Sequence, residues 1–305
     1  HNLPFMGPDV SEILNSYGLK LAQTDLPDWA RVMPLPLGLW SSDAIVGVSP
    51  TYAKEILTEE YGCGLNEFLQ LRHETLSGIL NGLDTDSFNP ETDTAIGVNF
   101  ALETLEKRAA NKNLLQARLG LPQESEIPLF AIISRMDVQK GVDLAFSALN
   151  TMKRLNWQAV ILGTGDPKLE EAAMKLQKLF PERIKVETRY DAGLARQIYA
   201  GSDMFLMPSR YEPCGLSQMI AMRYGCVPIV RAAGGLNDTV RHGVTGFVFE
   251  KAHHLSLVAA VKNALKVFAN HEQWQSLQRA GMAQDFSWEN SARQYLNLYL
   301  SLIKS

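Results

Sequence analysis

Charged residues follow short apolar runs at two places along the chain. In "ISRMDVQKG", Arg135 ends an apolar run and Lys140 follows it after a tight loop. Two cations beside the start of a helix suit the binding of a diphosphate. In "SRYEPCGLSQ", Glu212 lies just before a turn in which Pro213 fixes φ. The first N–H groups of the helix that follows would be unpaired, so they could meet sugar hydroxyls or a phosphate.

Two pairs of glycines extend this pattern. Gly163 and Gly165 end the run "ILGTG", and Gly234 and Gly235 follow "VPIVRAA". Each feature alone has an ordinary explanation: the cations as surface charges, the glycines as tight strand-to-helix turns. Two glycines without a third are a weak dinucleotide signal. Neighbouring strand ends that are all rich in donors and cations favour a binding site.

The stretch from residue 128 to residue 250 alternates fully apolar runs with helix-like segments, which indicates a parallel sheet covered on both faces. We predict an α/β domain with a doubly wound parallel sheet, whose ligands bind at the carboxyl ends of the strands. The predicted strands are 128–134, 159–163, 184–188, 204–209, 227–231 and 246–250. The predicted helices are 141–155, one from Pro167 after an Asp166 cap, 192–201, 216–225, 236–242 and a long one after 254.

Residues 1–82 carry too few elements to enclose a core. They hold predicted strands at 44–49 and 76–84 and a helix that starts at Pro50. We expect the end of a first α/β domain over 1–82, a second domain over 83–286 and a C-terminal helix over 287–305. The stripe on that helix should return to the first domain; it comprises Trp288, Tyr295, Leu298 and Leu302. The chain starts "HNLPFMG", and we expect it to be a piece of a longer protein.

Composition excludes several classes of protein. The 305 residues carry a net charge of −4, so no basic footprint for nucleic acid exists. The cysteines Cys63, Cys214 and Cys226 are odd in number and widely spaced, which favours a reducing compartment over a disulfide framework. No apolar run approaches the ~18 residues of a membrane span. We expect a cytoplasmic protein with no nucleic-acid or membrane partner and no metal site.

Several segments, taken in order, resemble the bacterial glycogen synthases and plant starch synthases. They are "HNLPF", "VGVSPTYAKEI", "GILNGLDTDSFNPETD", "ISRMDVQKGVDL", "ILGTGDPKLEE", "SRYEPCGLSQMIAMRYGCVPIVRAAGGLNDTV", "TGFVFE" and "FSWENSARQYLNLY". The resemblance implies a GT-B fold, with a doubly wound, Rossmann-like C-terminal domain and the tail of a second Rossmann-like domain. It implies retaining transfer of glucose from ADP-glucose, or UDP-glucose, to the non-reducing end of an α-1,4-glucan. No cofactor is implied, and a plastid is the alternative location.

The resemblance also implies roles for individual residues. Arg135 and Lys140 match a pair that holds the diphosphate, and Glu212 matches the donor-site glutamate. The other matched positions are Tyr190 at the base, His1 at the donor sugar and Asn81 at the cleft floor. His1 is equally well explained as a chain start without a role.

Backbone amides account for most of the remaining matches. Cys214, Gly215 and Leu216 match a turn whose amides meet the glucose 3- and 4-hydroxyls. Ser217 matches a small hydroxyl residue near the phosphate. The loop whose amides face the diphosphate is matched by Gly234, Gly235 and Leu236.

The chain departs from the family at a few points. A Lys-x-Gly-Gly motif and most of the first sheet are absent, and Ile220 stands where some broader relatives have a second glutamate. We read Asp84 and Asp86 of "DTD" as turn residues, not metal ligands. The favoured mechanism is same-face attack by the acceptor hydroxyl, without a covalent nucleophile. The alternative function is a catalytically incomplete module that binds a nucleotide sugar; a sugar epimerase fits less well.

Overall fold

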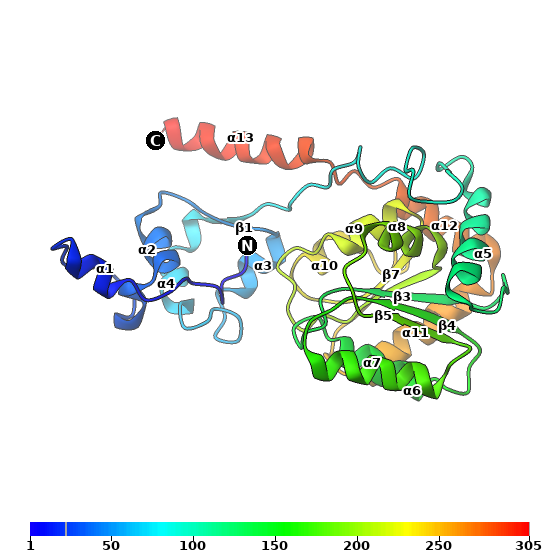
Figure 1. Ribbon diagram of the computed structural model, residues 1–305. Helices are drawn as coiled ribbons and strands as arrows, with labels where there is room; N and C mark the ends of the chain where they lie inside the picture. Colours follow the sequence, from blue (N-terminus) through cyan, green and yellow to red (C-terminus); the bar gives the residue numbers. More distant parts are fainter. Residues whose placement is uncertain (22, 305) are drawn as a thin grey trace. The chain divides into compact units, whose positions relative to one another are not determined.

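The computed structural model describes residues 1–21 and 23–304 (Figure 1). The chain forms two compact units. Unit 1 comprises His1–Asn81 and Ser291–Ser305, and unit 2 comprises Gly82–Asn290. In the sequence, unit 2 is therefore inserted between the two segments that build unit 1.

Unit 2 is built on a six-stranded parallel sheet in the order β5-β4-β3-β6-β7-β8. The direction in which strands are added reverses between β3 and β6, which marks the point where ligands bind in open α/β sheets. The predicted doubly wound sheet is confirmed. Its strands are β3 (Leu129–Ile133), β4 (Gln158–Leu162), β5 (Ile184–Glu187), β6 (Met204–Met207), β7 (Val227–Arg231) and β8 (Phe247–Phe249).

Helices cover both faces of this sheet. Figure 1 shows α6 (Val142–Thr151) and α7 (Pro167–Leu179) on one face and α8 (Ala192–Gly201) and α9 (Ser217–Arg223) on the other. The side chain of Asp166 accepts a hydrogen bond from the N–H of Lys168 at 2.8 Å, which caps α7 as expected. The remaining helices of unit 2 are the 3₁₀ helix η3 (Leu105–Lys107), α5 (Arg108–Leu119), α10 (Gly234–Thr239), α11 (His254–Phe268) and α12 (His271–Met282).

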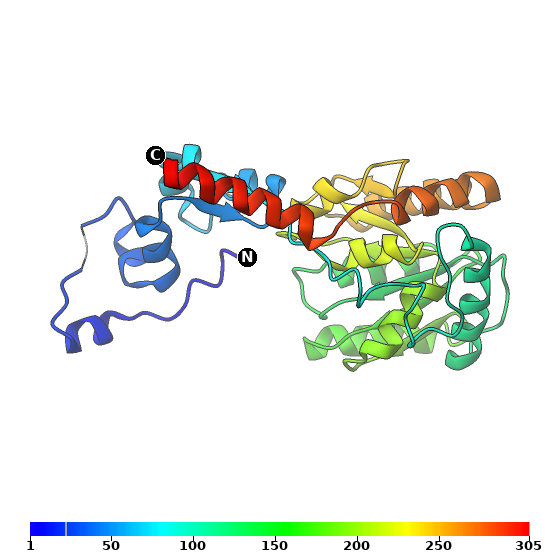
Figure 2. The ribbon, with the colours of Figure 1, turned by 90° about the horizontal axis from the view of Figure 1, so that it is seen from above.

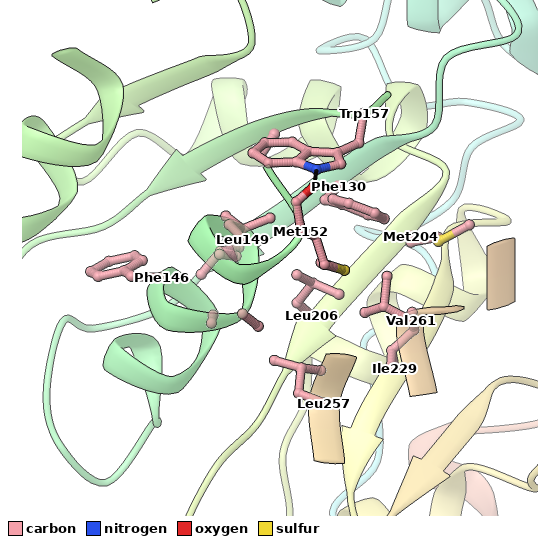
Figure 3. Close-up of a cluster of buried hydrophobic side chains, with 14 of the residues drawn as sticks. Phe130, Phe146, Leu149, Met152, Trp157, Met204, Leu206, Ile229, Leu257 and Val261 are labelled. Atoms are coloured by element: carbon pink, nitrogen blue, oxygen red, sulfur yellow. Dashed lines mark hydrogen bonds between the residues drawn. The ribbon is translucent and has the colours of Figure 1, made fainter. Parts of the chain in front are cut away.

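The main core lies between the sheet and helices α6 and α11. Figure 3 shows Trp157 at one side of this cluster, with Phe130 and Leu149 beside it. The indole Nε1 of Trp157 donates to the carbonyl oxygen of Met152 at 2.9 Å, so the largest buried side chain keeps its polar atom paired. The apolar strands and helix faces predicted from the sequence therefore meet in one packed layer.

Unit 1 contains the parallel pair β1 (Ile45–Gly47) and β2 (Leu76–Gly78) and the helix α3 (Pro50–Glu55). Ser49 caps α3 by accepting from the N–H of Tyr52 at 3.1 Å. The structure adds elements that we did not predict from the sequence. These are α1 (Ser11–Ser16), the 3₁₀ helices η1 (Asp28–Val32) and η2 (His73–Thr75), α2 (Pro34–Ser41) and α4 (Asn66–Leu71).

The C-terminal helix α13 (Trp288–Lys304) is a single continuous helix, drawn in red in Figure 2. Its residues from Ser291 onward belong to unit 1, where the Ser291 hydroxyl donates to the carbonyl oxygen of Leu80 at 2.6 Å. Of the predicted stripe, Tyr295 and Leu298 are half-buried, whereas Trp288 and Leu302 are exposed. The long helix predicted after residue 254 is confirmed as α11, which begins at His254 and ends at Phe268, and the separate helix α12 follows it from His271.

Candidate functional site

A small cavity lies where β3 and β6 diverge, and three predicted residues line it. Its volume is about 140 Å³, and Arg135 and Lys140 from the loop after β3 face it together with Ser217 from α9. Its other walls are the carboxyl ends of the two strands, formed by Ile132, Ile133, Ser134, Leu206, Met207, Pro208 and Ser209, with Val142 from α6. The cavity therefore occupies the position where an open α/β sheet binds its ligand.

Lys140 and Glu212 form an ion pair beside this cavity. Lys140 Nζ lies 2.9 Å from Glu212 Oε1 and 2.7 Å from Oε2, and the Ser209 hydroxyl donates to Oε2 at 3.0 Å. The Glu212 side chain is 5% exposed and that of Lys140 is 18% exposed. Removing one partner of such a shielded pair would leave the other charge uncompensated. The two residues therefore form one fixed electrostatic unit.

Further contacts tie together the two loops that carry this ion pair. Arg210 Nη1 and Nη2 each contact one carboxylate oxygen of Asp143 at 2.7 Å, a bidentate pair between the loop before Glu212 and the start of α6. The N–H of Arg210 donates to the carbonyl oxygen of Gln139 at 2.8 Å. The hydrogen bond from Arg210 is the largest of the effects that lower the pKa of Asp143. These contacts thus fix the loops after β3 and β6 to each other at the carboxyl end of the sheet.

Arg135 is held more loosely than Lys140. Its side chain is 63% exposed, and its Nη2 lies 3.2 Å from the carboxylate of Asp137. The same aspartate accepts the N–H of Lys140 at 2.8 Å, so it shapes the tight loop between the two cations. An exposed pair of this kind adds little stability, which leaves Arg135 able to reorient toward a ligand.

A second, larger cavity adjoins the first through Ser134, Arg135 and Ser217, which line both. Its volume is about 460 Å³, and the predicted residue Tyr190 lies at it with 87% of its surface exposed. Tyr199 lines it from α8 and hydrogen-bonds to Ser217; burial raises the pKa of Tyr199 above its ordinary value of 10.0. The two cavities together could accept an elongated ligand.

The glycine loop at the start of α10 packs directly against the Glu212 loop. A Cβ on Gly234 would lie 1.9 Å from the carbonyl oxygen of Glu212, and one on Gly235 would lie 2.1 Å from that of Cys214. The N–H of Gly235 donates to the Glu212 carbonyl at 3.1 Å, and that of Leu236 donates to Ala233 at 3.0 Å. These amides already have partners in the chain, so their role toward a diphosphate stays a prediction.

The remaining predicted residues lie in two different environments. In the turn after Glu212, Cys214 is buried, Gly215 is half-buried and Leu216 is 42% exposed. His1 and Asn81 belong to unit 1, where His1 lines a cavity of about 50 Å³ with Leu3, Tyr52 and other residues of that unit. The roles of these residues remain predictions.

Sequence reasoning missed several residues that line the second cavity. Phe88 comes from the segment after Gly82, and Arg189, Asp191 and Arg196 lie between β5 and the middle of α8. A signal for the last three was present, because they follow the predicted strand 184–188 at its carboxyl end. Phe88 had no such signal, since we interpreted residues 85–110 only as a junction.

Two family models match separate parts of the chain. The model described as "Glycosyl transferases group 1" matches residues 115–279, and that described as "Starch synthase catalytic domain" matches residues 1–71. A glycogen synthase of Aromatoleum aromaticum is 44% identical over 314 residues, covering 99% of this chain and 64% of the relative. One of Kosmotoga olearia is 46% identical, covering 89% of this chain and 58% of the relative. The chain thus spans about two-thirds or less of these relatives' length.

Solved structures give the same result at the level of the fold. The catalytic domain of starch synthase IV from Arabidopsis thaliana, bound to ADP and acarbose, has a TM-score of 0.91 and 35% identity. The match covers 100% of this chain and 66% of that one. The HepE protein of Anabaena in complex with UDP and glucose, at 17% identity, shares the fold with a TM-score of 0.61. The expected GT-B type α/β fold is confirmed, and the chain belongs to the group 1 glycosyl transferases.

Proposed function

We propose that this chain carries the donor site of a retaining glucosyltransferase that extends an α-1,4-glucan at its non-reducing end with glucose from ADP-glucose. The observation that carries the proposal is the Lys140–Glu212 pair beside the cavity between β3 and β6. Arg135 and Ser217 line both this cavity and the larger one with Tyr190. A sugar diphosphate occupies the first cavity, and the nucleoside occupies the second. The glycogen and starch synthases that the chain resembles support this choice of reaction.

The charges at the site fit the chemistry of this reaction. Breaking the bond between glucose and the diphosphate leaves positive charge on the sugar and negative charge on the departing phosphate. Lys140 and Arg135 meet that negative charge without a metal ion, because fixed cations stabilise a charge where it develops. Glu212 holds Lys140 in place through both carboxylate oxygens.

The rest of the step involves the acceptor. Its hydroxyl attacks the anomeric carbon on the face that the diphosphate leaves, and a departing phosphate oxygen takes the hydroxyl proton. Glu212 is an unsuitable covalent nucleophile, because its carboxylate already accepts hydrogen bonds from Lys140 and Ser209. Trapping a glucosyl adduct on a side chain would contradict this route.

The test compares Lys140→Ala with Lys175→Ala on the same 305-residue chain. Lys175 is a suitable control because it pairs with Glu171 on the exposed surface of α7, where its side chain is 70% exposed. We expect calorimetry to detect ADP binding in the unmodified chain and in Lys175→Ala, and a clear loss of affinity in Lys140→Ala. An unmodified chain that binds no ADP would show that the donor site is misplaced.

A glucosyl-incorporation assay separates the enzyme from the binding module. Where transfer occurs, Lys140→Ala should lower its rate on the order of 10²–10³-fold, because the lysine charge is worth most when the diphosphate leaves. The alternative is a chain that binds ADP but transfers nothing, since positioning of the acceptor supplies up to ~7–11 kcal/mol of the barrier reduction. Binding without transfer would therefore favour the incomplete module.

A further inference from the structure

The segment that follows Gly82 forms one wall of the second cavity. Figures 1 and 2 show it in cyan, and it runs along the helices on the α8 side of unit 2. Arg223 of α9 fixes its backbone: Nε donates to the carbonyl oxygen of Phe88 at 2.6 Å, and Nη2 donates to that of Thr85 at 3.1 Å. Phe88 lines the cavity from this anchored segment.

Arg196 of α8 is clamped to the same segment. Its Nη1 contacts the carboxylate of Asp93 at 3.1 Å, the Tyr224 hydroxyl at 3.3 Å and the carbonyl oxygen of Ser87. Its guanidinium carbon lies 4.5 Å from the centroid of the Phe88 ring. The Asp93 side chain is 4% exposed and also accepts the Tyr224 hydroxyl at 2.5 Å, so this anchor is itself held firmly.

Two of the three guanidinium nitrogens of Arg196, Nε and Nη2, are available to donate hydrogen bonds to a ligand. All its hydrogen bonds to the described part of the chain run through Nη1, so Nε and Nη2 have no partner there. Its side chain is 22% exposed, and it lines the second cavity but not the first. A cation whose orientation is fixed by a buried carboxylate and an aromatic ring is preorganised to donate to a ligand.

We propose that Arg196 is a nucleoside-binding residue that, with Phe88 as the adjoining wall, contacts the base and ribose of the donor nucleotide. This inference rests on the proposed function, which places a nucleotide in the two cavities. The assignment to the nucleoside follows from position, because the cations that meet the diphosphate line the first cavity and Arg196 does not. The free N–H groups match the oxygen and nitrogen acceptors of a ribose and a base.

The test measures the binding of ADP and of inorganic pyrophosphate to the full chain by calorimetry. We expect Arg196→Ala to weaken ADP binding about 10- to 100-fold, as for loss of a charged hydrogen bond, and to leave pyrophosphate binding unchanged. Arg183→Ala is the matched control, because Arg183 also contacts an aromatic ring, Trp157 at 5.9 Å, and backbone carbonyls, but lines neither cavity. It should bind both ligands normally.

Two further variants distinguish direct contact between Arg196 and the nucleotide from the positioning of Arg196 by Asp93. Asp93→Asn weakens the anchor but keeps the guanidinium, so its loss of ADP affinity should be smaller than that of Arg196→Ala. Arg196→Lys keeps the positive charge but lacks the planar guanidinium group, so it should still weaken ADP binding. If the alanine variant does not fold, the lysine variant tests whether Arg196 binds the nucleoside.

Two results would overturn the assignment. One is an Arg196 variant that binds ADP as tightly as the unmodified chain. The other is an equal loss of ADP and pyrophosphate binding, which would indicate general damage to the site. An unmodified chain that binds no ADP would instead refute the proposed function itself.

Discussion

The Lys140–Glu212 ion pair, which we propose to act at the donor site, also contributes to the stability of the fold. With the Glu212 side chain only 5% exposed, Lys140→Met should lower the free energy of unfolding by about 3 kcal/mol, because a buried carboxylate loses its partner. The double variant Lys140→Met with Glu212→Gln should recover much of that loss, because it removes both charges. Urea unfolding measures both. Lys175→Ala, at an exposed pair, should change stability by less than about 1 kcal/mol, and an equally small effect of Lys140→Met would contradict the argument.

The buried thiol of Cys226 makes the free energy of unfolding depend on pH in the alkaline range. Burial raises the pKa of its thiol from 9.0 to about 12. A raised pKa in the folded state favours the protonated form, so the stabilisation is complete below pH 9 and is lost as the pH rises above 9. We expect the free energy of unfolding to fall between pH 9 and pH 10, by up to about 1.4 kcal/mol, and Cys226→Ala to flatten this fall.

Urea titrations at several pH values would test this expectation. The window below pH 10 limits the contribution of Tyr199 and Tyr224, whose ordinary pKa is 10.0 and is also raised by burial. Burial raises the pKa of the Cys63 thiol as well, so the difference between the unmodified chain and Cys226→Ala is what reports on Cys226. Parallel curves for the unmodified chain and Cys226→Ala across that window would rule out a contribution from the thiol.

Among the elements, the Gly235 contact shows why the start of α10 needs a residue without a side chain. A Cβ there would lie 2.1 Å from the Cys214 carbonyl oxygen, and backbone atoms cannot move aside as a flexible side chain can. We expect Gly235→Ala to lower the free energy of unfolding by about 1–3 kcal/mol. Gly193→Ala in α8 is the control, since its nearest contact would be 3.7 Å away and its effect should stay within about 1 kcal/mol. Equal melting temperatures for the two variants would show that the loop yields easily.

Helices and strands that are marked by a capping residue or an apolar run in their own sequence were predictable. Helix α8 begins at Ala192, as predicted, because Asp191 caps it by accepting from the N–H of Leu194 at 2.8 Å. Strand β2 is shorter than the predicted 76–84, since its apolar run continues past Gly78 into a region where Leu83 bonds to Phe286 instead. The break between α11 and α12 had a signal that we did not use: Asn270 caps α12 by accepting from Gln273 at 3.1 Å.

The candidate site was predictable to a similar degree. The strand-end rule brought Arg135, Lys140 and Glu212 to one edge of the sheet, and the structure places the last two in direct contact. The contact between Phe88 and Arg196 joins segments far apart in the sequence, and no local pattern encodes such a pairing. Tertiary packing alone determines that wall of the second cavity.

For the molecule as a whole, unit 2 should be an independent folding unit. It has its own core and contains both cavities at the carboxyl edge of the sheet. We expect the fragment Gly82–Asn290 to unfold cooperatively and to bind ADP within about 3-fold of the affinity of the full chain, a difference below ~1 kcal/mol. Circular dichroism melting and calorimetry would check this. An unfolded fragment would show that unit 2 needs unit 1 in order to fold, and a folded fragment without affinity for ADP would assign part of the proposed donor site to unit 1. A separate property of the described residues is that none of their helices combines the length and the hydropathy of a membrane-spanning segment.

The ends of unit 2 meet, and this has a consequence for the order of folding. The N–H of Leu83 donates to the carbonyl oxygen of Phe286 at 2.6 Å, and Leu83 bridges to Ser287, so the chain enters and leaves unit 2 at one point. Before unit 2 forms, joining residues 1–81 to residues 291–304 requires closing a very long loop. Afterwards the same closure spans a short connection, which saves roughly 3 kcal/mol of chain entropy. The folding of unit 2 therefore lowers the entropic cost of assembling unit 1. The two segments of unit 1 are joined by a short connection only after the inserted unit has folded.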